Sequence, residues 1–69
     1  MYYFEIRFNS KNKLSLSKLI EDLDKKLEII SRYEDDYYIC YRLNFSVNPT
    51  ILTELKNNNN IYFLTHYLI

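Results

Sequence analysis

Glycine, alanine and tryptophan are absent from the sequence, and proline, cysteine, histidine and methionine occur once each. Without glycine the chain cannot form a P-loop, a dinucleotide-binding fingerprint or a nucleophile elbow, because each of these motifs needs glycine at fixed positions. The single cysteine, Cys40, excludes an internal disulfide, and no cluster of cysteine and histidine indicates a structural metal. The missing residues therefore argue against the common enzyme classes, and we expect no cofactor.

The reactive side chains that remain are few and scattered. Cys40 could act as a nucleophile with His66 as its base, but each lies in the middle of an apolar segment, where a buried or half-buried structural role is more common. The acidic run Glu34, Asp35 and Asp36 could bind a cation, although a solvated turn is the commoner role of such a run. We predict no catalytic residue, no metal site and no small-molecule substrate.

The sequence also has no excess of either charge, because nine basic and nine acidic residues give a net charge of zero. Such a chain has no global field that would draw it onto nucleic acid without specificity, although a local basic patch is still compatible with this balance. No apolar run approaches the roughly 20 residues of a membrane span. The amino-terminal residues resemble neither a signal peptide nor a transit peptide, so we expect the protein to work where it is made, away from membranes.

Aromatic residues are abundant, with eight tyrosines and four phenylalanines among 69 residues. A single domain over residues 1–69 buries only about 60% of the surface of its unfolded chain. So many large side chains cannot all be buried in so small a body. The excess indicates a binding partner.

Hydrophobic periodicity predicts six elements. Residues 2–8 alternate as a half-buried strand, with Phe4, Ile6 and Phe8 on one side. A helix capped by Ser15 or Ser17 follows and carries a stripe of leucine and isoleucine up to residue 27. Residues 27–33 and 37–45 are predicted as strands joined by a tight turn. In the second of these, Tyr37, Ile39, Tyr41, Leu43 and Phe45 share one face.

Asn48 and Pro49 then begin a second helix as N-cap and first helical residue, and residues 61–69 form a last strand. The order β-α-β-β-α-β predicts an α+β, ferredoxin-like domain, in which two helices cover one face of a four-stranded antiparallel sheet. The other face is left open, and we expect the protein to act there.

All three arginines, Arg7, Arg32 and Arg42, lie on predicted strands, whereas every lysine lies in a helix or loop. If the apolar rows face the helices, the three guanidinium groups cross adjacent strands of the open face, with Tyr3 and Tyr38 between them. Arginine interleaved with tyrosine is typical of RNA-binding and protein-binding surfaces. We predict these five residues as the binding site for RNA or a partner.

A plainer interpretation stays open: the arginines could be unrelated surface residues, one of them paired with Glu5 or Glu28. The glycine-bearing aromatic motif of sheet-type RNA-binding domains is absent, so we do not expect readout of stacked single-stranded bases.

The chain resembles the bacterial-type small-subunit ribosomal protein six family. The opening Met-Tyr-Tyr-Phe-Glu-Ile is similar to the start of that family's first strand, and residues 37–45 are similar to its aromatic third strand. Residues 53–55 and 63–69 resemble its second helix and last strand. The order of elements agrees over nearly the whole chain, whereas the hairpin is shorter, Thr65 stands where the family usually has arginine, and the charged tail is missing.

The resemblance implies a structural role: binding to small-subunit rRNA together with a neighbour like ribosomal protein eighteen. The frequent residues isoleucine, tyrosine, asparagine, lysine and phenylalanine have AT-rich codons, as in organelle genomes. We therefore expect an organelle-encoded protein of the mitochondrion, or alternatively of a plastid. The competing hypothesis is a free ferredoxin-like module that dimerises or senses a ligand as a regulator.

Overall fold

Strict alternation in the first strand decides which side of the sheet becomes the core. Phe4, Ile6 and Phe8 are fully buried on one side of β1 (Tyr2–Phe8), and Arg7 is exposed on the other. Successive side chains of a strand point to opposite faces, so this pattern fixes the orientation of the sheet. β1 has the bounds that the sequence predicts.

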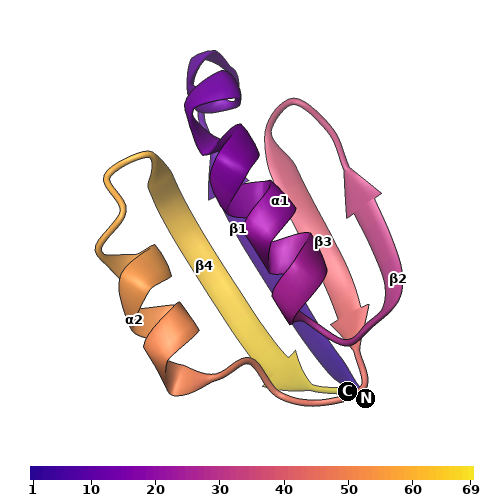
Figure 1. The fold of residues 1–69 in the computed structure, drawn as a ribbon. Helices are drawn as coiled ribbons and strands as arrows, with labels where there is room; N and C mark the ends of the chain where they lie inside the picture. The colour runs from indigo at the N-terminus through magenta and orange to yellow at the C-terminus, as the bar shows by residue number, and fades with distance from the viewer.

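The computed structural model describes residues 1–69 as one four-stranded antiparallel sheet in the order β2-β3-β1-β4, with both helices on one face (Figure 1). This is the ferredoxin-like arrangement that the order of elements predicts. The elements after β1 are two 3₁₀ turns (Ser10–Asn12 and Leu14–Leu16), α1 (Ser17–Lys26), β2 (Ile29–Glu34), β3 (Tyr38–Leu43), α2 (Pro49–Lys56) and β4 (Ile61–Leu68).

The core lies between the sheet and the two helices. Its buried apolar side chains come from β1, β3, both helices and the segments that lead into the helices. They are Phe4, Ile6, Phe8, Leu16, Ile20, Leu23, Ile39, Tyr41, Leu43, Val47 and Leu55. The ring of Phe4 stacks on that of Tyr41 at 5.8 Å between centroids. The apolar side of the sheet is therefore largely taken up by packing against the helices.

The two helices begin differently. Asn48 Oδ1 accepts a hydrogen bond from Thr50 N at 2.8 Å, and Pro49 is the first residue of α2, as predicted. At α1 the prediction of a serine cap is wrong: the N-cap is Leu16, without a side-chain hydrogen bond. Leu16 is buried in the core, and the 3₁₀ turn that carries it leads directly into the helix.

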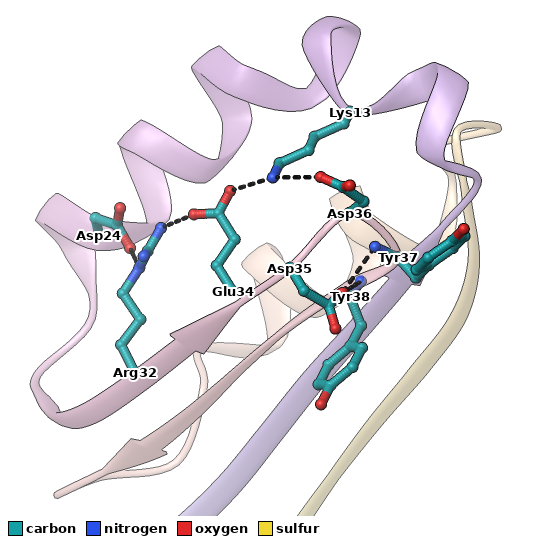
Figure 2. Close-up of polar contacts among 8 residues, drawn as sticks. All are labelled: Lys13, Asp24, Arg32, Glu34, Asp35, Asp36, Tyr37 and Tyr38. Atoms are coloured by element: carbon teal, nitrogen blue, oxygen red, sulfur yellow. Dashed lines mark hydrogen bonds and ion pairs between the residues drawn. The ribbon is translucent and has the colours of Figure 1, made fainter.

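The third strand is shorter than the sequence predicts. Tyr37 and Phe45 lie outside β3 and are 62% and 66% exposed, so they do not share its buried face. The turn explains why the strand begins late: Asp35 Oδ1 accepts hydrogen bonds from Tyr37 N and Tyr38 N, which holds Tyr37 in the turn and lets β3 begin at Tyr38 (Figure 2).

Candidate functional site

The side of the sheet opposite the helices, here called the open face, carries an aromatic and charged surface. Register places Arg7 opposite both Tyr38 and Phe63, and Tyr3 opposite both Arg42 and Tyr67. The open face is formed by Ser31, Tyr33, Tyr38, Cys40, Arg42, Tyr3, Glu5, Arg7, Phe63, Thr65 and Tyr67. Four of the five residues predicted as the site, Tyr3, Arg7, Tyr38 and Arg42, thus lie together on one surface.

Glu5 lies at the centre of the open face and is only 6% exposed, although no helix covers it. Its neighbours across the sheet are Cys40 and Thr65. Tyr3 Oη and Arg7 Nε both donate hydrogen bonds to its carboxylate. Burial opposes ionisation of Glu5, but these two hydrogen bonds and the charge of Arg7 outweigh it, and the pKa of the carboxyl is lowered.

Arg7 is the side chain best placed to bind a ligand. Its Cζ lies 5.8 Å from the ring centroid of Tyr38 and 5.3 Å from that of Phe63, so two rings flank one guanidinium. The hydrogen bond to Glu5 uses Nε alone, and the side chain is 51% exposed. Arg7 therefore presents its two terminal amino groups to solvent in a fixed orientation, which suits a phosphate or carboxylate.

Two further ring pairs extend this surface over all four strands. Tyr3 packs on Tyr67 at 5.1 Å between centroids, and Tyr33 packs on Tyr38 at 5.6 Å. Tyr33 and Tyr67 are 54% and 53% exposed. Burial and the hydrogen bond to Glu5 raise the pKa of Tyr3 above its ordinary value of 10.

Arg32 does not belong to the open face, and its predicted place there is wrong. A β-bulge between Ile29 and Ser31 inserts one residue into β2 and exchanges the two faces of the strand beyond it. Tyr33 therefore lies on the open face, and Arg32 lies on the helix side opposite Tyr41.

There Arg32 joins a chain of charges that ties α1 to the hairpin (Figure 2). Its Nε lies 2.8 Å from Asp24 Oδ1 and its Nη2 2.6 Å from Glu34 Oε1. Lys13 Nζ continues the chain to Glu34 and Asp36 at 3.5 and 3.3 Å. Burial works against the charge of Arg32, but the two carboxylates outweigh it and raise its pKa. The role of Arg32 in this arrangement is structural.

An open groove of about 560 Å³ runs along this chain of charges, between α1 and β2. Its charged side chains are Lys13, Glu21, Asp24, Arg32 and Glu34. Each of them already pairs with an opposite charge: Glu21 with Lys25 outside the groove, and the other four with one another. A ligand would have to break those pairs, so the open face is the stronger candidate.

The remaining reactive residues do not come together. Cys40 lies on the open face of β3, whereas His66 lies opposite Phe4 on the helix side of β4, with β1 between the two strands. They cannot act as a nucleophile and its base. No three His, Cys, Asp or Glu side chains group closely enough to hold a metal ion. Neither helix has the length and apolar character needed to span a membrane.

The site predicted from the sequence did not include Glu5, Tyr33, Phe63 and Tyr67, which the structure adds to the open face. Glu5, Phe63 and Tyr67 could have been found, because period-two alternation in their strands places them beside Arg7 and Tyr3. The plainer interpretation of the arginines is correct in one respect, since Arg7 does pair with Glu5. Comparisons with protein-family models, curated proteins and solved structures give no match for this chain.

Proposed function

We propose that this protein binds RNA through its open face, as a structural protein of an organellar small ribosomal subunit, most simply the mitochondrial one. The observation that carries the proposal is Arg7, which Glu5 holds between two aromatic rings with its outer N–H groups free. Flat, stacked guanidinium groups and tyrosine hydroxyls are common means of gripping RNA phosphates and exposed bases.

Charge on the open face supports RNA as the ligand. Its acidic and basic residues are one carboxylate, Glu5, and two guanidinium groups, Arg7 and Arg42. Glu5 is occupied by Tyr3 and Arg7, while Arg42 is exposed and has no ion pair within the chain. The face is weakly positive on a protein of zero net charge, which suits docking at a defined place rather than non-specific coating of nucleic acid.

The ribosomal part of the proposal rests on the resemblance to the ribosomal protein six family. The ferredoxin-like fold is compatible with that family. Such a protein would contact small-subunit rRNA and a neighbour like ribosomal protein eighteen, without membrane, cofactor or small-molecule substrate.

Sedimentation of an epitope-tagged chain from organelle lysates tests the ribosomal role. We expect the protein to migrate with the small subunit at physiological salt and to move to light fractions after ribonuclease treatment, because its contacts require intact rRNA. Migration only in the light fractions of an untreated lysate contradicts this role.

Replacing Arg7 with alanine tests the open face directly. We expect affinity for a small-subunit rRNA transcript to fall about tenfold, equivalent to about 1.4 kcal/mol, because the stacked guanidinium is lost. Fluorescence anisotropy at fixed salt measures the effect.

The matched control is Lys18→Ala, which removes the same charge from the exposed outer side of α1. It should leave the affinity within about twofold. Arg42→Ala, which leaves Glu5 and its partners intact, guards against misfolding of the first variant and should also weaken binding. Unchanged affinity in both arginine variants contradicts binding through this face.

A further inference from the structure

The two edges of the sheet differ in how well they are protected against pairing with another strand. β2 has six residues, carries Arg32 and Glu34, and is interrupted by a bulge. β4 has eight residues and contains no Asp, Glu, Lys, Arg or proline. Charges, bulges and short length are the usual devices that keep an edge strand unpaired. β2 has all three of these devices, whereas β4 is long and uncharged and has only a register shift near its start, where Arg7 faces Phe63 and Phe8 faces Ile61.

Exposed apolar side chains also concentrate at the β4 edge. Five of the eleven large apolar side chains that are most exposed belong to β4 or to the residue after it. They are Tyr62, Phe63, Tyr67, Leu68 and Ile69. A long apolar edge of this kind indicates a partner.

The hydrogen bonds of β1 and β4 show which backbone groups of this edge are free. Ile69 N donates to Met1 O at 3.0 Å. Every second residue before Ile69, namely Tyr67, Thr65 and Phe63, therefore directs its N–H and C=O groups toward β1. In an antiparallel pair such residues alternate with residues that point away. Leu64, His66 and Leu68 therefore direct their N–H and C=O groups outward from the sheet edge, where no other element forms a backbone hydrogen bond with them.

We propose that the occupant of this edge is a second copy of the chain, paired antiparallel through β4 about a two-fold axis at Thr65. In this register Leu64 of each copy forms a hydrogen-bonded pair with His66 of the other. The outward groups of these two residues are then satisfied in both copies, over the regular part of β4 that follows the register shift at Tyr62. This inference does not depend on the proposed RNA binding.

Side-chain chemistry fits the same register. Thr65 meets its own counterpart, and Phe63 meets Tyr67 of the second copy, both as the closely spaced pairs in which side chains interact best. Threonine–threonine and aromatic–aromatic pairs are favourable across antiparallel strands. An uncharged strand also pairs with itself without like-charge repulsion. No other strand of the chain combines these properties.

The product is a continuous sheet in which the helices of both copies lie on one side. Phe63 of one copy comes beside Tyr67 of the other on the opposite side, so the two open faces join into a single aromatic surface. The dimer therefore doubles the surface that carries Arg7.

Substitution at His66 tests the pairing, because this residue is exposed and its N–H points outward. Proline at such an edge position removes a donor that β1 does not use, and is tolerated there in sheets. We expect the wild-type chain to have twice the 8.5 kDa mass of one copy in sedimentation equilibrium. His66→Pro should raise the dimer dissociation constant at least about tenfold, the ratio that corresponds to about 1.4 kcal/mol.

The matched control is His66→Val, which keeps the N–H and suits a strand, and it should remain dimeric. Circular dichroism should show folded protein in both variants. If His66→Pro fails to fold, hydrogen exchange of the wild type replaces it: the amides of Leu64 and His66 should be protected at high concentration and lose protection on dilution. A wild-type chain that stays monomeric up to about 1 mM, or in which these amides exchange freely at that concentration, overturns the inference.

Discussion

The chain in which alanine replaces Phe4 is expected to be unfolded at room temperature. Phe4 is fully buried on the central strand β1 and stacks on Tyr41. Truncation of a buried phenylalanine to alanine costs about 3–5 kcal/mol, because the cavity left behind cannot fully collapse. A core of this size supplies a net stability of only about 3–5 kcal/mol, so the loss is comparable to the whole. Far-ultraviolet circular dichroism and urea titration measure the result.

Phe45 offers the matched control for this substitution. It is 66% exposed after the end of β3, so Phe45→Ala removes the same atoms without opening a cavity. The free energy of unfolding should change by less than about 0.5 kcal/mol. If Phe4→Ala unfolds in urea at the wild-type midpoint, the described core does not hold the domain together.

The contrast between β1 and β2 shows what the sequence could predict. In β1, alternation from Tyr2 to Phe8 is uninterrupted, and both its bounds and its buried row were predicted correctly. In β2, a bulge occurs at the adjacent residues Ile29 and Ile30. The one inserted residue exchanges the faces of all later residues of the strand. Arg32 was misplaced for this reason alone. This bulge is defined by the pairing of β2 with β3, and the local sequence of β2 does not indicate it.

The site was predictable to a similar degree. Arg7, Arg42, Tyr3 and Tyr38 were placed together because period two carries a face across strands whose order the fold determines. The burial of Glu5 was not predictable, because it depends on side chains from three strands closing over one carboxylate. Hydrophobic periodicity does not indicate that a charged residue on the uncovered side of a sheet is buried.

Glu5→Gln is expected to weaken both the stability of the fold and the proposed binding of RNA. The carboxylate is 6% exposed and accepts hydrogen bonds from Tyr3 and Arg7. The neutral amide accepts such bonds more weakly, and its NH₂ group has to be buried beside Cys40 and Thr65. We expect unfolding at pH 7 to require about 1–3 kcal/mol less than in the wild type, as for the loss of charge-assisted hydrogen bonds. Urea titration measures this difference, and anisotropy should show weaker RNA binding because Arg7 loses its fixed orientation.

The pH dependence of the stability difference between wild type and Glu5→Gln tests whether the carboxylate causes that difference. The pKa of Glu5 in the folded protein lies below its ordinary value of 4.5, so ionised Glu5 stabilises the fold above pH 4.5. As the pH falls below 4.5, Glu5 becomes protonated in the unfolded chain before it does so in the folded chain. The contribution therefore shrinks and is lost once the pH is below the lowered pKa of the folded protein. The gap between wild type and Glu5→Gln should therefore narrow below pH 4.5. Glu54→Gln, an exposed carboxylate on α2 with no ion pair, should differ little from wild type at neutral pH. A Glu5→Gln gap that stays constant from pH 7 to acid unfolding would mean that packing, rather than charge, explains the effect.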